Sequence, residues 1–338
     1  MDEQLLPIGA DIVNILTVLD IECELRNAKE NDLVQKFDFD LKNLKHYAKL
    51  KKAIEVLTAC MHKDIQLAES ETNHFAIEIK KPADKIYYRD YIQMDDANNK
   101  YSALIGIDNN GHAINFDVKK TIHSLIGGAT GMGKTSLINS ILYSLSKKNT
   151  KQTMQIALID TKKTLAMWEN LPILFDKPAT DGYYASDLLS KVIVEMVKRT
   201  NKLSKLKMTK AEPDTFPHLL LVVDELADLM LASNKKYVED KLVKIAQLGR
   251  AVNISIILAT QNPIVKVCTS LIKANCPTRI ALKTVSIKDS MNIFDNKKAS
   301  TLSGAGDSMI RTADNPTEIR YKCLFLEDQE ILDYVNNL

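Results

Sequence analysis

Apolar residues recur along the chain with two different periods. Over residues 10–27 and 41–68 they recur at steps of three and four, the spacing of one face of a helix. Over residues 74–118 they alternate with polar residues in short segments, and residues 109–111 (Asn-Asn-Gly) form a turn signal between two such segments. The pattern predicts a helical region over residues 1–73 and a small β element over residues 74–118.

From residue 119 onward, short apolar runs alternate with helical patterns. The runs cover residues 122–126, 156–159, 219–223, 254–259 and 279–282, and the helices are predicted near residues 134–147, 185–206, 236–250 and 264–273. This alternation is typical of an α/β fold with a mostly parallel sheet covered by helices on both faces. Residues 119–338 are therefore predicted to form one α/β domain.

Composition limits the possible functions. The 338 residues include 45 Lys plus Arg and 43 Asp plus Glu, a net charge of +2, which excludes a polycation and confines nucleic-acid binding to local basic patches. The five cysteines form no CxxC pair and are odd in number, which favours reduced thiols in the cytoplasm. The sequence shows neither a secretory signal nor about 18 consecutive apolar residues. We therefore expect a cytoplasmic protein without direct membrane insertion, which would reach a membrane only through a partner.

Residues 128–135 match the pattern GxxxxGK[ST] at every position, between a predicted strand and a predicted helix. Glycines let backbone N–H groups converge on phosphate oxygens, and the helix N-terminus adds partial positive charge. We expect Lys134 to bind the β- and γ-phosphates of ATP and Thr135 to ligate Mg²⁺. The predicted nucleotide-binding residues are Gly128, Ala129, Thr130, Gly131, Met132, Gly133, Lys134, Thr135 and Ser136. The alternative is a flexible Gly-rich turn. The predicted strand before the loop and the predicted helix after it disfavour this alternative.

Two adjacent carboxylates, Asp224 and Glu225, end the apolar run at residues 219–223. Burial of charge at the end of a core strand is costly, which favours a functional role. We expect Asp224 to join the Mg²⁺ shell and Glu225 to act as the general base that activates water in ATP hydrolysis. A carboxylate pair that caps a helix is the alternative interpretation.

Three further side chains are candidates for the reaction. Gln261 follows the run at residues 254–259, where its amide would contact the γ-phosphate or simply position the loop. The other candidates are Arg250 and Arg279. Each is either a surface ion-pair partner or the extra cation that phosphoryl transfer needs. A neighbouring subunit often supplies that cation.

Together these segments resemble the FtsK/SpoIIIE family of DNA translocases, which are RecA-like P-loop ATPases. The similar blocks follow the family's order between residues 102 and 325, at residues 123–136, 158–162, 195–199, 222–230, 249–251, 258–263, 271–280 and 304–307. Two of the blocks depart from the family pattern: Thr161 replaces the proline of Asp-Pro-Lys, and Asn262 replaces the arginine of Thr-Gln-Arg-Pro.

The resemblance implies a ring, expected to be a hexamer, that hydrolyses ATP with Mg²⁺ while double-stranded DNA passes through its channel. It implies that Asp224 and Glu225 are the Walker B pair and that Arg250 contacts the ATP of a neighbouring subunit. Lys273 matches a channel-lining lysine. Lys266 and Lys288 are further candidate DNA contacts that would compensate for Asn262, although each also fits an ordinary surface lysine.

The membrane domain and the DNA-orienting winged helix of chromosomal members have no counterpart in this sequence. It is therefore more similar to the short translocases of plasmids, conjugative elements or phage-like elements, with a membrane-anchored or element-encoded protein as a further expected partner. Two other functions stay open: a coupling ATPase that recruits protein or nucleoprotein cargo for secretion or conjugation, and a nucleotide-gated switch with little turnover.

Overall fold

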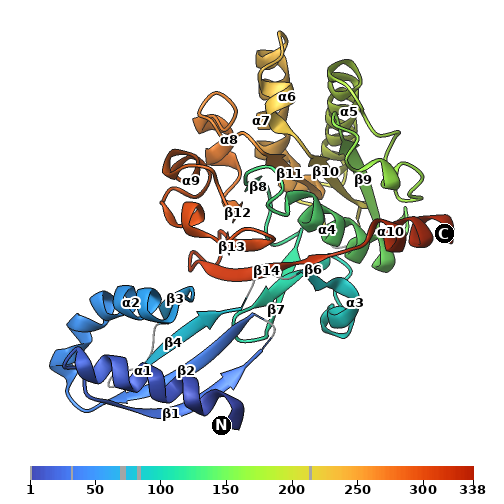
Figure 1. Cartoon of the computed structure of the whole chain (residues 1–338). Coiled ribbons are helices and arrows are strands. Elements are labelled where there is room, and N and C mark those ends of the chain that lie inside the picture. Colours follow the sequence, from blue (N-terminus) through green and yellow to red (C-terminus); the bar gives the residue numbers. More distant parts are fainter. Residues whose placement is uncertain (1, 32, 69–73, 82–84, 213–214) are drawn as a thin grey trace. The chain divides into compact units, whose positions relative to one another are not determined.

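The computed structural model describes residues 2–31, 33–68, 74–81, 85–212 and 215–338, and the chain divides into two compact units (Figure 1). The small unit comprises Met1–Asp84 and Asn109–Gly111, and the large unit comprises Lys85–Asp108 and His112–Leu338. The predicted boundaries after residues 73 and 118 are therefore corrected: the small unit extends to residue 84 and also includes residues 109–111. The helical segment and the first part of the predicted β element belong to the same small unit.

The small unit consists of a four-stranded antiparallel sheet and two helices. The strands lie in the order β1 (Cys23–Glu30), β2 (Val34–Leu41), β4 (His74–Lys80) and β3 (Ile65–Ala68), and the helices are α1 (Leu6–Val18) and α2 (Tyr47–Met61). Two 3-10 helices, η1 (Glu3–Leu5) and η2 (Leu44–His46), precede them. Alternate strand residues such as Phe37 and Phe39 share one core with Ile12 of α1 and Leu57 of α2. Both helices therefore cover the same face of the sheet.

The prediction of an all-helical region over residues 1–73 is wrong for β1, β2 and β3. Helix α1 ends at Val18, and the chain turns at Asp20, which has a φ of 57°. In β2 the buried residues Phe37, Phe39 and Leu41 are separated by single aspartates. This spacing has the period of a strand, so the sequence of β2 itself contains the strand signal.

The large unit is built on one sheet, which has ten strands in the described residues. Five neighbouring strands run parallel, in the order β12 (Thr278–Leu282), β8 (Ser124–Gly127), β11 (Ile254–Thr260), β10 (His218–Val223) and β9 (Met154–Ile159). Antiparallel strands continue the sheet beyond β12, in the order β13 (Asp307–Arg311), β14 (Ile319–Phe325), β6 (Ser102–Asp108) and β7 (Ala113–Asp117), and β5 (Ile86–Tyr87) pairs with β14. The predicted α/β class is confirmed, and its parallel strands are those found from the apolar runs.

The prediction of a separate β element before the main domain is wrong for strands β6 and β7. They form the predicted hairpin, but β6 pairs with β14 near the end of the chain, Tyr321 lying opposite Asp108. A pairing between residues more than 200 positions apart leaves no local trace in the sequence. The hairpin strands are therefore part of the large sheet.

The helices of the large unit connect and cover the strands. They are α3 (Tyr88–Tyr91), α4 (Lys134–Lys148), α5 (Gly182–Lys205), α6 (Leu226–Met230), α7 (Lys235–Leu248), α8 (Ser270–Asn275), α9 (Ile287–Phe294) and α10 (Asp328–Asn336), with 3-10 helices η3 (Ile92–Met94), η4 (Ala166–Trp168), η5 (Gly249–Val252) and η6 (Lys298–Thr301). The helices predicted from the sequence correspond to α4, α5, α7 and the much shorter α8. No described helix is both long and apolar enough to cross a membrane.

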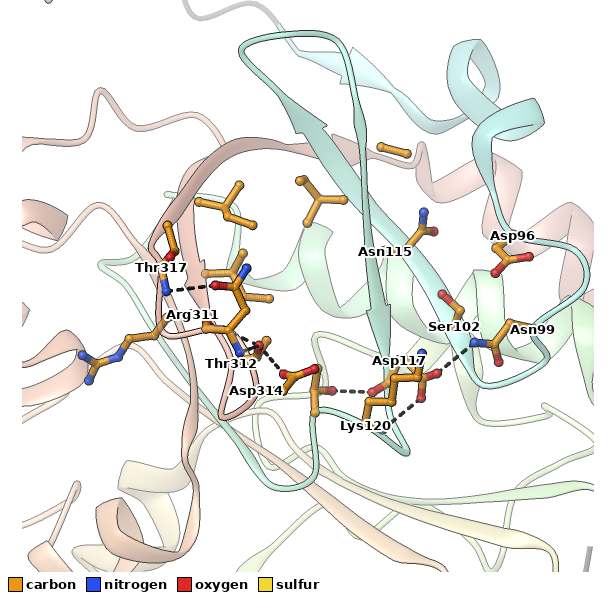
Figure 2. A pocket seen from close by; sticks show the side chains of 16 residues that line it. Asp96, Asn99, Ser102, Asn115, Asp117, Lys120, Arg311, Thr312, Asp314 and Thr317 are labelled. Atoms are coloured by element: carbon orange, nitrogen blue, oxygen red, sulfur yellow. Dashed lines mark hydrogen bonds between the residues drawn. The ribbon is translucent and has the colours of Figure 1, made fainter. Parts of the chain in front are cut away.

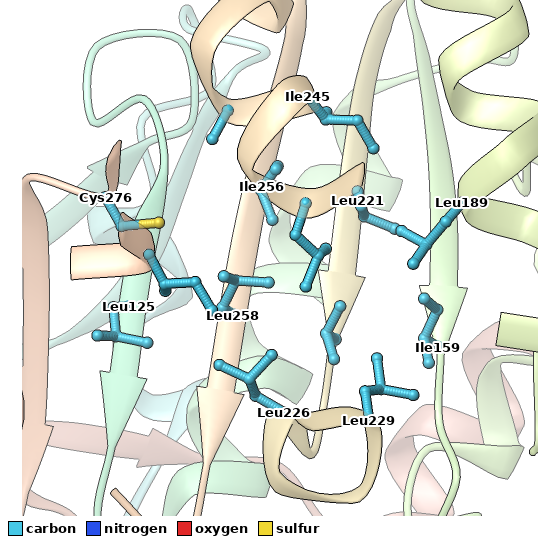
Figure 3. Packing of buried hydrophobic residues seen from close by; sticks show 14 of the residues in the cluster. Leu125, Ile159, Leu189, Leu221, Leu226, Leu229, Ile245, Ile256, Leu258 and Cys276 are labelled. Carbon is cyan, nitrogen blue, oxygen red and sulfur yellow. The ribbon is translucent and has the colours of Figure 1, made fainter. Parts of the chain in front are cut away.

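Strand β10 is buried on both faces. Its residue Leu221 packs in one cluster with Leu189 of α5 and Ile245 of α7 (Figure 3). Its intervening residues Leu220 and Val222 are also fully buried, and successive side chains of a strand point to opposite faces. Burial on both faces explains why the strand is a continuous apolar run that ends at the first carboxylate.

Candidate active site

Three parallel strands end at the same edge of the large sheet and place the predicted groups together. Strand β8 leads into the loop at residues 128–133, β10 into Asp224 and Glu225, and β11 into Gln261. Strand β11 lies between β8 and β10, with Thr260 opposite Gly127 and Leu258 opposite Val223. Gln261 is therefore positioned between the phosphate-binding loop and the two carboxylates.

The loop at residues 128–133 is held by backbone hydrogen bonds. The N–H of Ala129 donates to the carbonyl of Lys283 at 2.8 Å, and the N–H of Met132 donates to the carbonyl of Ala129 at 3.2 Å. Gly133, with a φ of 106°, is the N-cap of the 15-residue helix α4. The loop thus leads directly into the helix N-terminus, the geometry that an anion site requires.

A pocket of about 310 Å³ lies against this loop. It is lined by Lys85, Ala129, Gly131, Gly133, Lys134, Thr135, Ser136, Gln261, Ala305, Gly306, Cys323 and Phe325. Most of the predicted loop residues and Gln261 are among them. Lys85, Cys323 and Phe325 were not predicted, because β5 and β14 reach the loop only through the antiparallel part of the sheet.

A second glycine turn, at residues 304–306, fixes the loop from the other side. The N–H of Gly306 donates to the carbonyl of Met132 at 3.0 Å, and the N–H of Cys323 donates to the carbonyl of Gly306 at 2.8 Å. A Cβ atom on Gly133 would lie 3.0 Å from the Cα of Gly306. The sequence showed this turn only as part of the family resemblance, and its contact with the phosphate-binding loop is a finding of the structure.

Lys134 is joined directly to the end of β10. Its Nζ donates to Oδ1 of Asp224 at 2.6 Å and also to the backbone carbonyl of Asp224. The two side chains are 2% and 0% exposed, so each buried charge is neutralised by the other. The second carboxylate oxygen, Oδ2 of Asp224, accepts a hydrogen bond from the hydroxyl of Thr164 at 2.8 Å.

Glu225 is held on both carboxylate oxygens. Oε1 accepts from the hydroxyl of Thr260 at 2.7 Å and from the N–H of Ala227 at 3.2 Å, whereas Oε2 accepts from the N–H of Gln261 at 3.1 Å. The bond to Ala227 makes Glu225 the N-cap of α6. The helix-capping interpretation is therefore confirmed for Glu225, and its role in hydrolysis stays a prediction.

Lys162 is a site residue to which the sequence analysis gave no role. Its Nζ donates to Oε2 of Glu225 at 2.9 Å and to Oε1 of Gln261 at 3.4 Å. Burial alone would lower the pKa of Lys162, but the bond to Glu225 and the charge of that carboxylate raise it. The hydroxyl of Thr130 also donates to Oε1 of Gln261, at 2.9 Å, and so links that amide to the loop.

Arg250 lies at the opposite edge of the sheet. It belongs to η5, which precedes β11, whereas the phosphate-binding loop lies beyond the other end of that strand. Seven residues of strand, Ile254–Thr260, span about 20 Å. The structure therefore does not bring Arg250 to the phosphate-binding loop of its own chain.

Arg250 lines a second pocket, of about 500 Å³, together with Lys119, Lys210 and His218. The lining contains three cations and no carboxylate, and Arg250 and Lys210 form no ion pair with any described residue. Burial lowers the pKa of His218 to about 3, with a smaller contribution from the charge of Lys119. This edge of the sheet is thus locally basic in a chain of nearly balanced charge.

The three candidate DNA-binding lysines lie away from the phosphate-binding loop. Nζ of Lys273 on α8 forms an ion pair with Oδ1 of Asp295 at 2.6 Å. Lys266 and Lys288 are exposed, the latter on α9. Arg279, the other arginine considered, is buried and donates to the carbonyl of Lys273 at 2.6 Å, so it is not a surface ion-pair partner.

A further pocket, of about 420 Å³, lies over β6, β7, β13 and β14 (Figure 2). Its polar groups are largely bonded to one another: Asn99 donates to Asp117 at 2.8 Å, and Thr312 donates to Asp314 at 2.6 Å. Arg311 points away from the other labelled side chains. None of the predicted site residues lines this pocket, so the site at the loop remains the candidate.

Comparison with known proteins shows the family of this chain. The sequence profile of the FtsK/SpoIIIE family matches residues 88–216 and 207–265, together more than half of the chain. The chain belongs to the FtsK/SpoIIIE family. DNA translocase FtsK of Oceanobacillus iheyensis is 34% identical over 299 residues, which cover 82% of this chain and 38% of that protein. DNA translocase SftA of Bacillus subtilis strain 168 is 37% identical over 242 residues, 68% of this chain and 25% of that protein. The chain thus spans well under half the length of these FtsK/SpoIIIE relatives.

Solved structures with low sequence identity share the fold. The pCW3 conjugation coupling protein TcpA, in a monomer form with ATPγS, superposes with a TM-score of 0.67 at 20% identity, covering 97% of this chain and 98% of TcpA. The cytoplasmic domain of the type VII secretion ATPase EccC from Thermomonospora curvata gives a TM-score of 0.62 at 22% identity, covering 71% of this chain and 31% of EccC. The P-loop ATPase fold expected for an FtsK/SpoIIIE member is thereby confirmed.

The approach of Gly133 to Gly306 can be tested by a matched pair of substitutions. Gly131 and Gly133 both have positive φ, but no atom lies within 4 Å of a Cβ built on Gly131. We expect Gly131→Ala to lower the free energy of unfolding by about 1–2 kcal/mol, the cost of the left-handed conformation. Gly133→Ala should lower the free energy of unfolding by about 1 kcal/mol more than Gly131→Ala does, or by a larger amount, because Gly306 must also move.

Urea unfolding followed by the fluorescence of Trp168, the single and fully buried tryptophan, measures both values. Equal losses in the two variants would show that the contact with Gly306 does not fix the loop.

Proposed function

We propose that this chain is the ATP-hydrolysing motor of a double-stranded DNA translocase. The observation that carries the proposal is the position of the Glu225 carboxylate. Hydrogen bonds from Thr260, Ala227 and Gln261 hold it at the same edge of the sheet as the phosphate-binding loop. A positioned carboxylate beside a phosphate site provides the general base that hydrolysis of a phosphoanhydride needs. The 34–37% identity to DNA translocases supports the choice of DNA as the moved substrate.

Phosphate binding would require an exchange of partners at Lys134. Its ammonium group is bonded to Asp224 and lines the pocket at the loop. In the proposed complex the ammonium moves from the carboxylate to the β- and γ-phosphate oxygens, while the N–H groups at the start of α4 bind the same anion. Lys134 then remains neutralised throughout, because one anion replaces another.

The donor set at the loop fits Mg²⁺. Magnesium prefers oxygen ligands and is usually held by one or two protein groups together with phosphates and water. The hydroxyl of Thr135 lines the pocket, and Oδ1 of Asp224 is released when Lys134 changes partner. We propose that these two residues hold Mg²⁺, which when bound neutralises charge that develops on the phosphate oxygens.

Glu225 would accept the proton of the attacking water. Its Oε2 atom is bonded to the ammonium group of Lys162 at 2.9 Å, and a carboxylate oxygen is a group that can accept a proton from water. Because both oxygens are occupied, Lys162 must release Oε2 before that oxygen can face a water molecule. Gln261, bonded to Lys162 and Thr130, is positioned to respond to a γ-phosphate and so to link binding to this release.

The first prediction concerns Glu225→Gln and DNA. We expect the wild-type chain to hydrolyse ATP faster when long duplex DNA is present, and the stimulation to weaken as salt is raised. Glu225→Gln should lower kcat about 100-fold or more, because an amide does not accept the proton, and should change the Kd for ATP less than about threefold. Steady-state hydrolysis and equilibrium binding measure the two quantities.

The matched control is Glu169→Gln, which makes the same change at an exposed glutamate and should leave hydrolysis unaltered. A wild-type rate that duplex DNA leaves unchanged at every salt concentration would contradict DNA as the substrate and favour protein cargo. Retention of full function by Glu225→Gln would point to a nucleotide-gated switch.

We also propose that Arg250 acts on the nucleotide of a neighbouring copy in a ring, expected to be a hexamer. The cations that line the pocket at the phosphate-binding loop are Lys85 and Lys134, and no arginine lines it. Arg250 lies at the other edge of the sheet, beside Lys119 and Lys210 and without an ion pair among the described residues. A head-to-tail contact that closes into a ring brings opposite edges of adjacent copies together.

Mixing two inactive variants tests the action in trans. Arg250→Ala and Glu225→Gln should each hydrolyse ATP slowly when alone. In mixed rings, an intact Glu225 on one chain meets an intact Arg250 on its neighbour, so activity should recover above the sum of the separate rates. No recovery, at concentrations where sizing shows mixed oligomers, would contradict this role.

The DNA path and the cellular setting complete the proposal. The residues proposed to contact the phosphate backbone of DNA are Lys266, Lys273 and Lys288. Lys266 and Lys288 are exposed, and Lys273 forms an ion pair with Asp295. The chain is proposed to act in the cytoplasm on plasmid, conjugative or phage-like DNA, together with a membrane-anchored or element-encoded protein partner.

A further inference from the structure

We infer that the base of the bound nucleotide stacks on the ring of Phe325. This inference rests on the proposed nucleotide site and assigns the part of the pocket that the phosphates do not use. The phosphate end is marked by Lys134, Thr135 and Gln261. Cys323 and Phe325 of β14 and Lys85 belong to the same pocket, and they are neither part of the loop nor bonded to the carboxylates.

The pocket wall formed by β14 and the turn at residues 304–306 has the character of a base site. Ala305, Gly306, Cys323 and Phe325 offer small or apolar groups, and the aromatic ring is the one flat surface among the lining residues. Burial raises the pKa of the Cys323 thiol to about 11, so this side chain stays neutral at physiological pH and suits an uncharged ring. Nucleotide sites commonly combine such an apolar wall with a polar end that binds the phosphates.

The ring of Phe325 is held in place from one side. The ring of Tyr87 meets it edge to face, with 5.7 Å between centroids and 79° between planes. Phe325 and Tyr87 are also opposite each other in the pairing of β14 with β5. The guanidinium of Arg89 lies 4.4 Å from the centroid of the Tyr87 ring and extends this support. A ring fixed in this way loses little freedom when a ligand stacks on it.

Among the described residues, a cation also lies over the ring of Phe325. Nζ of Lys85, an exposed residue, lies 3.8 Å from the centroid of the Phe325 ring. A cation over an aromatic ring at an exposed site contributes roughly two- to fivefold to an equilibrium. Stacking of a base on an aromatic side chain contributes roughly 5- to 150-fold. A base therefore displaces Lys85 from the ring face.

Stacking on Phe325 also limits the class of ligand that this surface recognises. Every nucleobase has a π-face, so stacking on Phe325 strengthens the binding of a nucleoside triphosphate relative to the triphosphate group alone. It does not by itself select adenine over guanine. The class of ligand is therefore a nucleotide with an intact base, bound through its ring as well as through its phosphates.

The test compares ATP with inorganic tripolyphosphate, using the full-length chain and isothermal titration calorimetry. Phe325→Leu removes the aromatic ring but keeps an apolar side chain, and Phe325→Tyr keeps the ring. We expect Phe325→Leu to weaken ATP binding by roughly 5- to 150-fold while tripolyphosphate binds as it does to the wild type. Phe325→Tyr should bind ATP within about threefold of the wild type.

Tripolyphosphate binding also reports whether the phosphate-binding loop is intact in each variant. The inference is overturned if Phe325→Leu binds ATP as tightly as the wild type, if it weakens both ligands equally, or if Phe325→Tyr fails like Phe325→Leu. Wild-type binding of tripolyphosphate as tight as that of ATP would overturn it as well. A wild-type chain that binds neither ligand would instead contradict the proposed nucleotide site itself.

Discussion

The buried ion pair between Lys134 and Asp224 is the interaction on which the site depends. It joins the first residue of α4 to the end of β10, with Nζ 2.6 Å from Oδ1 and both side chains almost fully buried. Neither charge could stay in this position alone, because removal of one partner of a buried pair costs roughly 3–5 kcal/mol. The pair therefore fixes the spacing between the phosphate-binding loop and the carboxylates before any nucleotide binds.

Other polar groups of the site are also held by their neighbours. Lys162 pairs with Glu225, and Thr164 bonds to Asp224 while its N–H donates to Asp160 at 3.0 Å. A phosphate that takes Lys134 from Asp224 thus alters the contacts of the loop after β9 as well. In the proposed mechanism, binding at the phosphate-binding loop would therefore be coupled to the loop after β9 through an exchange of partners.

The sequence predicted the parts of the site that local spacing encodes. The phosphate-binding loop has a fixed pattern, and the carboxylates follow a strand whose burial on both faces makes it a continuous apolar run. It did not predict Lys162, Gly306 or Phe325 as site residues, because their contacts join segments that are distant along the chain. Arg250 was a candidate cation from the sequence, and the family resemblance implied its action on a neighbouring subunit. Only the structure shows that Arg250 lies at the opposite edge of the sheet from its own loop. In the small unit, the alternation over residues 34–41 encoded a strand that a helical interpretation overlooked.

The most direct test is a structure of this chain with a non-hydrolysable ATP analogue, in which the position of the Lys134 ammonium is measured. The account predicts that Nζ leaves Oδ1 of Asp224 and lies within hydrogen-bonding distance of a phosphate oxygen. A bound analogue with Lys134 still paired to Asp224 would contradict the exchange of partners on which the proposed mechanism depends.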